Sequence, residues 1–273
     1  MKPDRVIIGA NNSYSKDVIS EVYKPLYLRD FPIVYTDPKS AEVIKYAANA
    51  FLATKISFIN EIAFLCENVG ANVKEVAKGI GMDKRIGNKF LHAGPGFGGS
   101  CFPKDTSAFV KTGEIFGARQ TIVETVVAVN QTVKQRMIKK VIETLENELE
   151  GKIICVLGVT FKPNTDDIRE APSLTIIPSL QKRKAIIRAM DPKGEKFGRN
   201  ALNGISWFDN PYKAARGADL IIVLTEWNEF RALNLKDLSS QMRTPYLVDL
   251  RNIYSKKEAL NCGFKKYVSV GRK

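Results

Sequence analysis

The feature that most constrains the fold is an alternation of short apolar runs with helical stretches after Gly151. Four apolar runs have the length of a strand: Lys152–Val159, Ile186–Met190, Leu220–Leu224 and Tyr246–Asp249. Helical stretches lie between them, at Pro172–Leu180 and Pro211–Arg216. Strands that alternate with helices are typical of a parallel sheet covered by helices. Residues 150–273 are therefore predicted to form a Rossmann-like α/β domain with a parallel sheet.

The preceding segment has the pattern of an all-helical domain. Thr36-Asp37-Pro38 places a capping side chain before a proline, which is typical of a helix start. Roughly 30 residues follow, up to Gly70, with apolar side chains at helical spacing on more than one face. A helix of this kind usually lies inside a helical domain or a dimer interface. Further helices are predicted at Val73–Gly79, near Lys104–Phe116 and from about Thr121 to Leu149, so that residues 37–149 form a central helical domain with one long helix.

The first 36 residues contain too few elements for a domain of their own. They have the pattern of a strand (Arg5–Ala10), a helix (Lys16–Leu28) and a second strand (Pro32–Tyr35). We therefore expect residues 1–36 to be the remnant of a larger N-terminal α/β domain.

The net charge suggests an anionic ligand but does not identify it. Lys and Arg exceed Asp and Glu by 42 to 29, a formal charge of +13. The basic residues are scattered, and no clustered basic face with interleaved aromatic residues is present. A nucleic-acid binder is therefore the last-ranked interpretation, and no nucleic-acid partner is predicted.

The cysteines and the apolar runs indicate a reduced, cytoplasmic protein. Cys66, Cys101, Cys155 and Cys262 form no CxxC pair, and their spacing fits no zinc module. Cys66 and Cys155 lie in apolar helical and strand patterns and are predicted to be buried. No signal peptide and no apolar run of membrane-spanning length is found. No metal site and no membrane partner are predicted.

The stretch GPGFGGSCFPKD, residues 94–105, is the most unusual part of the sequence. Its glycines satisfy the dinucleotide pattern GxGxxG, but no strand precedes them, and Pro95 lacks the N–H group that a phosphate loop needs. Bare backbone instead allows a bulky ligand to approach closely. Cys101 lies just before a helix predicted to begin at Pro103, where the helix N-terminus and Lys104 favour a thiolate. The alternative is a glycine turn with an inert thiol.

These twelve residues resemble the catalytic loop of the UDP-glucose 6-dehydrogenases, within the UDP-glucose/GDP-mannose dehydrogenase family. Further segments resemble family motifs in the same order: PDRVIIGA, AEVIKYAANAFLATKISFINE, GMDKRIGNKFLHAGPGFGG, GVTFKPNTDDIREAPS and TEWNEF. The resemblance covers essentially the whole chain. Ser100 to Asp105 is similar to the UDP-glucose branch rather than to relatives that act on UDP-N-acetylmannosamine.

The resemblance implies an NAD-dependent four-electron oxidation of UDP-glucose to UDP-glucuronate. Cys101 would be the nucleophile that forms a thiohemiacetal and then a thioester. Lys45 and Asn49 are four residues apart and share a helix face, and the resemblance assigns them to the reacting C6 oxygen. A snorkelling lysine and a surface asparagine are the alternative. Asp105 would orient the catalytic water and Lys45.

The resemblance also implies binding residues. Those for the sugar nucleotide are Lys45, Arg85, Phe90, Leu91, His92, Ala93, Gly94, Phe97, Gly98, Phe161, Lys162 and Arg251. Lys104 and Arg169 match positions that contact NAD. The long helix would form a homodimer, with Arg85 crossing into the partner's site.

Two departures from the family pattern limit these expectations. His92 replaces a lysine that many relatives carry. The family's N-terminal NAD-binding domain, and a Pro-Glu-Phe-Leu type motif whose glutamate assists thioester hydrolysis, do not occur in this sequence. We expect an incomplete enzyme whose turnover alone is doubtful. A non-catalytic UDP-sugar-binding and dimerisation fragment, or a dehydrogenase for another nucleotide sugar, are the alternatives.

Overall fold

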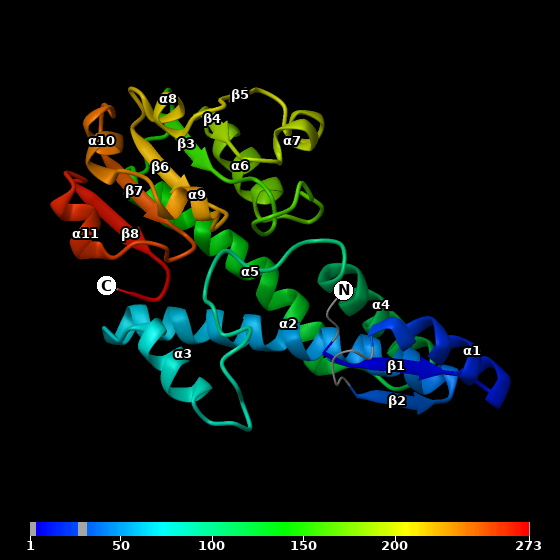
Figure 1. The fold of residues 1–273 in the computed structure, drawn as a ribbon. Coiled ribbons are helices and arrows are strands. Elements are labelled where there is room, and N and C mark those ends of the chain that lie inside the picture. Colours follow the sequence, from blue (N-terminus) through cyan, green and yellow to red (C-terminus); the bar gives the residue numbers. More distant parts are fainter. Residues whose placement is uncertain (1–3, 27–31, 273) are drawn as a thin grey trace. The chain divides into compact units, whose positions relative to one another are not determined.

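The computed structural model describes residues 4–26 and 32–272 (Figure 1). The chain divides into two compact units, Met1–Phe51 and Leu52–Lys273. One continuous helix, α2 (Pro38–Val69), runs from the first unit into the second. The predicted domain boundaries at residues 36/37 and 149/150 remain predictions.

The first unit contains two parallel strands joined through a helix. Strand β1 (Val6–Gly9) pairs with β2 (Ile33–Thr36), and between them lie α1 (Ser13–Tyr23) and the short 3₁₀ helix η1 (Lys24–Leu26). The predicted helix Lys16–Leu28 therefore begins three residues too late, because the Asn12 side chain accepts a hydrogen bond from the Ser15 N–H and caps α1. Its predicted last residues, 27 and 28, lie outside the described residues. The strand–helix–strand pattern is confirmed.

The start of α2 is confirmed where the capping pattern predicted it. The Asp37 carboxylate accepts hydrogen bonds from the Ser40 N–H at 3.0 Å and from its hydroxyl at 2.6 Å. Gly70, with a φ of 77°, follows the last residue of the helix. Three further helices follow: α3 (Val73–Gly81), α4 (Phe102–Ile115) and α5 (Thr121–Thr144). Helix α5 ends before the predicted Leu149, because Glu146 and Asn147 both adopt positive φ.

The second unit contains a six-stranded, all-parallel sheet in the order β5-β4-β3-β6-β7-β8. The strands are β3 (Ile153–Leu157), β4 (Ile186–Met190), β5 (Ile205–Trp207), β6 (Leu220–Val223), β7 (Tyr246–Asp249) and β8 (Lys266–Ser269). This is the strand order of a Rossmann fold, and its direction reverses between β3 and β6. The predicted parallel sheet is confirmed. Strands β5 and β8 escaped prediction because they are short edge strands with polar residues.

Helices cover both faces of this sheet. The connecting helices are α6 (Ser173–Gln181), α7 (Glu195–Ala201), α8 (Pro211–Ala215), α9 (Asn228–Arg231), α10 (Leu235–Ser240) and α11 (Lys256–Asn261). Along β3, Ile154 and Val156 belong to a core that includes residues of α5 and α6, whereas Cys155 and Leu157 belong to one that includes residues of α8, α10 and α11. Burial raises the pKa of Cys155 to about 12, so this thiol stays protonated and serves packing. Cys66 is also buried, as predicted.

A buried carboxylate ties the beginnings of β3 and β6 together and predicts a pH dependence. Burial raises the pKa of Asp219, but hydrogen bonds from Arg243 and the Ile153 N–H outweigh it, and the net pKa lies below its ordinary value. This pair therefore stabilises the folded state. The stabilisation is complete above about pH 4 and is lost as the pH falls through the lowered pKa that Asp219 has in the folded state. We expect Arg243→Gln to lower the free energy of unfolding at pH 7. The difference in unfolding free energy between this variant and the unsubstituted chain is expected to shrink as the pH falls below about 4. Urea unfolding across this range measures it, and a pH-independent difference would contradict the assignment.

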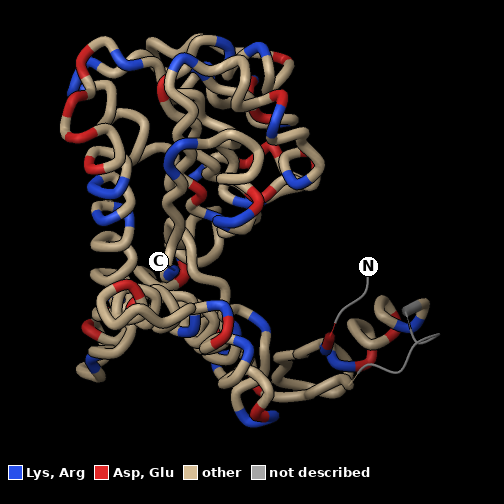
Figure 2. Tube along the Cα trace, turned by 90° about the vertical axis from the view of Figure 1, so that its left-hand side faces the viewer, with Lys and Arg blue, Asp and Glu red and all other residues tan. Residues whose placement is uncertain are grey.

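The charges do not separate into one basic face. Figure 2 shows Lys and Arg interspersed with Asp and Glu along the trace. Many of them form surface ion pairs, such as Arg119 with Glu124 and Arg199 with Glu195. Among the described residues, no helix has both the length and the apolar character needed to cross a bilayer.

Candidate functional site

The glycine loop of residues 94–99 is held by two buried asparagines. Asn60, on α2, accepts a hydrogen bond from the Gly94 N–H at 2.9 Å. Asn130, on α5, accepts one from the Phe97 N–H at 2.9 Å and donates one to the Phe97 carbonyl at 3.1 Å. The two asparagines are 1% and 4% exposed, so solvent cannot replace these bonds. The loop is therefore fixed through its backbone.

Two of the glycines are required because other chain segments lie against them. A Cβ on Gly98 would collide with the Glu170 carbonyl oxygen, and one on Gly99 would lie 2.7 Å from the Phe161 ring. The Gly99 N–H also donates to the Arg169 carbonyl at 2.8 Å. The absence of side chains thus lets the loop pack directly on the segment that follows β3.

Cys101 immediately precedes helix α4, which begins at Phe102 with Pro103 in its first turn. The thiol is exposed, and its sulfur lies 3.8 Å from the Ser100 hydroxyl oxygen. One helical turn later, the fully buried Asp105 carboxylate lies 3.3 Å from the Lys104 ammonium. The predicted helix start is confirmed within one residue, and it places an accessible thiol at a helix N-terminus.

Three aromatic rings pack around the start of α4. The Phe102 ring meets the Phe97 and Phe90 rings edge to face, with centroids 5.9 Å and 6.0 Å apart. Phe97 belongs to a small core cluster with Ala53 of α2 and Val126 of α5. Phe90 adopts a φ of 65°, which is uncommon for a bulky residue and marks a constrained position. The loop thus rests on an aromatic support.

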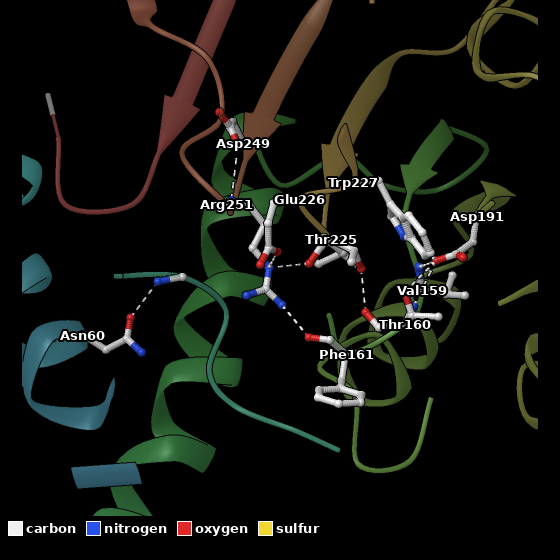
Figure 3. A network of polar contacts seen from close by, with 12 residues as sticks. Asn60, Val159, Thr160, Phe161, Asp191, Thr225, Glu226, Trp227, Asp249 and Arg251 are labelled. Carbon is white, nitrogen blue, oxygen red and sulfur yellow. Dashed lines mark hydrogen bonds and ion pairs between the residues drawn. The ribbon is translucent and has the colours of Figure 1, made fainter. Parts of the chain in front are cut away.

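The other side of the site comes from the carboxyl ends of the strands, near the reversal point of the sheet (Figure 3). Arg251, just after β7, donates from Nε to the Leu224 carbonyl at 2.7 Å and from Nη2 to the Phe161 carbonyl at 3.1 Å. Its Nε also lies 3.1 Å from a carboxylate oxygen of Glu226. Lys162 Nζ lies 5.3 Å from the centroid of the Phe161 ring. Open parallel sheets bind ligands at this kind of edge.

The same sheet does not fit a dinucleotide. In a Rossmann domain, an acidic residue after the second strand binds a ribose hydroxyl. Here Asp191, after β4, instead accepts hydrogen bonds from the Val159 and Thr160 N–H groups and from the Trp227 indole (Figure 3). The segment after β3 also lacks the glycine fingerprint. The carboxylate thus holds the turn that precedes Phe161 in place.

These elements enclose a pocket of about 230 Å³. It is lined by Ile56, Asn60, Phe90, His92, Gly94, Gly96, Phe97, Gly98, Phe102, Phe161, Lys162, Glu226 and Arg251. Two of these side chains are cations, and much of the wall is backbone and aromatic ring. Such a pocket suits a ligand with a phosphate group and a flat or sugar-like body.

The structure brings most of the predicted binding residues together in this pocket, but not all of them. Cys101 does not line it, although the neighbouring Phe102 does. Leu91 and Ala93 belong to the hydrophobic core and do not line this pocket. Arg85 is exposed and paired with Asp83 at 2.7 Å, outside the pocket.

The two residues predicted to contact NAD are near Cys101, Arg169 in space and Lys104 along the chain. The pKa of Arg169 is raised, mainly by its hydrogen bonds to Asp167 and in smaller part by the nearby Cys101. Lys104 follows Cys101 by three residues in the first turn of α4. Lys45 and Asn49 belong to the first unit, on α2, and their roles remain predictions.

Sequence reasoning missed the residues that position the others. Asn60, Asn130, Asp191 and Glu226 were not predicted as site residues. For the two asparagines a signal exists, since each interrupts an apolar helical pattern (SFIN and VAVN), and a buried amide needs a partner. Asp191 and Glu226 follow strands, and only the sheet topology shows what they face.

Comparison with known proteins agrees with this arrangement. Residues 39–132 match the model of the UDP-glucose/GDP-mannose dehydrogenase family central domain, and residues 155–256 match that family's UDP binding domain. The chain is 53% identical over 273 residues to a UDP-glucose 6-dehydrogenase of Rhizobium meliloti, covering 99% of this chain and 62% of that protein. It is 43% identical to the UDP-glucose 6-dehydrogenase of Rickettsia bellii, covering 99% and 63%.

A solved structure shows the same fold. The UDP-glucose dehydrogenase of Pyrobaculum islandicum superposes with a TM-score of 0.88 at 36% identity, covering 100% of this chain and 60% of that one. The chain thus spans about 62% of the length of the Rhizobium relative and a similar share of the others.

Proposed function

Since this chain belongs to the UDP-glucose/GDP-mannose dehydrogenase family, we propose that it forms part of an enzyme that oxidises UDP-glucose to UDP-glucuronate with NAD. The observation that carries the proposal is the pocket in which loop backbone, aromatic rings, Lys162 and Arg251 converge beside the helix that begins after Cys101. Its two cations suit the diphosphate, and its glycine wall suits a sugar lying against backbone. The names of the most similar relatives favour UDP-glucose as the substrate.

In this proposal, Cys101 supplies the covalent chemistry. Its thiolate adds to the C6 aldehyde and forms a thiohemiacetal, which oxidation converts into a thioester that water then hydrolyses. NAD supplies the hydride-accepting chemistry in both oxidation steps. Asp105, one turn along α4, orients the water, while Lys45 and Asn49 stabilise charge on the C6 oxygen.

We propose that residues 4–26 and 32–272 provide only a small part of an NAD site. The six-stranded sheet has neither the glycine fingerprint nor a carboxylate open to a ribose at its second strand, because Asp191 accepts hydrogen bonds from the protein itself. Lys104 and Arg169 are the residues that we propose meet the nicotinamide end. We therefore expect UDP-glucose, but not NAD, to bind this chain strongly.

We further propose that the parent enzyme is a homodimer formed through α2. Phe58, Leu65 and Val69 are large apolar residues of this helix that are 49%, 55% and 66% exposed. Their spacing of seven and four residues places them on one helical face. In such a dimer, Arg85 would reach the partner's pocket.

Calorimetric titration tests the proposed function. UDP-glucose, UDP-galactose, UDP-N-acetylmannosamine and NAD are titrated separately into this chain and into Cys101→Ala. We expect UDP-glucose to bind tightest and Cys101→Ala to retain that affinity within about threefold, since the thiol acts in catalysis. Binding of NAD without binding of any UDP-sugar would contradict the proposal, and tighter binding of another UDP-sugar would assign a different substrate.

The role of Cys101 has a separate readout in its alkylation by iodoacetamide. UDP-glucose is expected to slow alkylation of Cys101, because the bound sugar would cover the thiol. Cys262, which is partly exposed and directly follows α11, serves as the internal control in the same sample. Equal labelling of Cys101 with and without saturating UDP-glucose would place the sugar away from this thiol.

A further inference from the structure

A second and larger pocket adjoins the one described above. It has a volume of about 480 Å³ and lies between α3, the segment of residues 88–93, α9 and the segment after β7. Four cationic side chains line it: Lys74, Lys78, Arg231 and Arg251. No Asp or Glu is among its lining residues. His92 and Arg251 line both pockets and form the wall between them.

Three of these cations lack the partners that other cations of the chain have. Within residues 4–26 and 32–272, Lys74, Lys78 and Arg231 make no side-chain hydrogen bond and no ion pair. By contrast, Lys140 pairs with Glu67 at 2.8 Å, and Arg243 pairs with Asp219. Arg251 is paired with Glu226, but that carboxylate lines the first pocket and not the second. The positive charge of the second pocket is therefore left uncompensated by its walls.

Arg272 adds a further positive charge near Lys74. The pKa of Lys74 is lowered by partial burial and by the nearby cations Arg272 and Arg231, and the opposing influence of Asp249 is smaller than the effect of burial. Asp249 is fully buried and already accepts hydrogen bonds from Arg251 N–H, Tyr254 N–H and the Tyr267 hydroxyl. The Asp249 carboxylate is thus occupied by hydrogen bonds within the protein. Like charges gathered in a concave site raise the local concentration of anions.

The remaining walls suit an organic body beside the charge. Val73, Ala77 and Leu91 form an apolar part of the lining, and Asn88 and Asn252 add amide groups. The Asn252 amide already has partners within the protein, because its nitrogen donates a hydrogen bond to the Val270 carbonyl and its oxygen accepts one from the Val270 N–H. The pocket therefore offers cations, a small apolar surface and one further amide.

We propose that this second pocket binds a phosphate or diphosphate group, held by Lys74, Lys78 and Arg231, beside the first pocket. Each cation can donate charge-assisted hydrogen bonds to phosphate oxygens. The inference does not depend on the proposed function, since it rests on charges that the first pocket does not contain. Because both pockets share Arg251 and His92, an anion bound in one pocket changes the affinity of the other pocket for its ligand.

Inorganic pyrophosphate titrated by calorimetry tests this site. Lys74→Gln/Lys78→Gln is expected to bind pyrophosphate at least about tenfold more weakly than the unsubstituted chain, since two charge-assisted contacts are lost. Lys182→Gln/Lys257→Gln removes the same charge from residues that line neither pocket and serves as the matched control. Adenosine diphosphate is titrated in parallel, to distinguish a nucleotide ligand from a free phosphate ligand. If adenosine diphosphate binds more tightly than pyrophosphate, and this binding is lost in Lys74→Gln/Lys78→Gln, the phosphate in this pocket belongs to a nucleotide.

The outcomes distinguish this inference from the proposed function. Equal pyrophosphate affinities of the two double variants, or no binding to the unsubstituted chain, would overturn the second site. Loss of pyrophosphate binding in Lys162→Gln but not in Lys74→Gln/Lys78→Gln would assign the anion to the first pocket and also overturn it. Pyrophosphate binding that depends on Lys74 and Lys78, in a chain that binds no UDP-sugar, would support the second site while contradicting the proposed function.

Discussion

Replacing Asn130 with alanine is expected to lower the free energy of unfolding by about 2–4 kcal/mol and to remove measurable UDP-glucose binding. The substitution deletes both hydrogen bonds to Phe97 and leaves a buried N–H and a buried carbonyl without partners. The loop then loses its attachment to α5, and the glycine wall of the pocket is no longer fixed. Chemical unfolding and calorimetric titration of the same samples measure the two effects.

The matched control for this prediction is Asn200→Ala. Asn200 is exposed in α7, and its side chain makes no hydrogen bond among the described residues, so its loss is expected to change stability by less than about 0.5 kcal/mol. If Asn130→Ala unfolds and binds UDP-glucose like Asn200→Ala, the loop is positioned by something other than this amide.

Replacing Arg251 with methionine is expected to weaken UDP-glucose binding by about a hundredfold, which corresponds to roughly 2.7 kcal/mol. The pocket loses a cation, and the Glu226 carboxylate, 3.1 Å from Arg251 Nε, then repels the diphosphate. Arg251→Lys keeps the charge but cannot serve both the Leu224 and Phe161 carbonyls, so an intermediate loss is expected. Calorimetric titration measures all three affinities.

A double variant isolates the contribution of the carboxylate. In the Arg251→Met background, Glu226→Gln is expected to recover about threefold to tenfold of the lost affinity, because it removes the repulsion. Arg216→Met, at an exposed arginine outside both pockets, is the control for loss of net charge. Equal binding by Arg251→Met and Arg216→Met would show that the diphosphate does not lie against Arg251.

Sequence patterns predicted the helices and strands that have a clear apolar run or a clear capping residue in their own sequence. The continuous apolar runs of β3 and β6, the Asp37-Pro38 start of α2 and the proline-marked start of α4 are all confirmed. Strand β5 was missed because three residues at a sheet edge carry too little periodicity. Helix α5 was overextended because Glu146 and Asn147 adopt positive φ, a conformation that asparagine favours but glutamate does not. Boundaries depend on such single-residue conformations.

The site was predictable where chemistry is concentrated in one stretch of sequence and not where distant elements meet. The glycine loop was recognisable because its glycines and Cys101 lie within one short stretch, although Gly98 and Gly99 are needed for packing against other chain segments. The contact of Gly98 with the Glu170 carbonyl, and the fork of Arg251 between Leu224 and Phe161, depend on tertiary packing between segments more than 25 residues apart. Likewise, only the strand order shows that Asp191 occupies the ribose-binding position of a Rossmann sheet and is already saturated.

The central claim is that the glycine loop and the carboxyl ends of the strands together form a sugar-nucleotide pocket within residues 52–273. A crystal structure of this chain soaked with UDP-glucose tests it most directly. The account predicts density for the diphosphate against Lys162 and Arg251, with the hexose along Gly94 to Gly98 and its C6 end directed toward Cys101. Density for the nucleotide against Asp191, Val159 and Thr160, with the glycine loop empty, would contradict it.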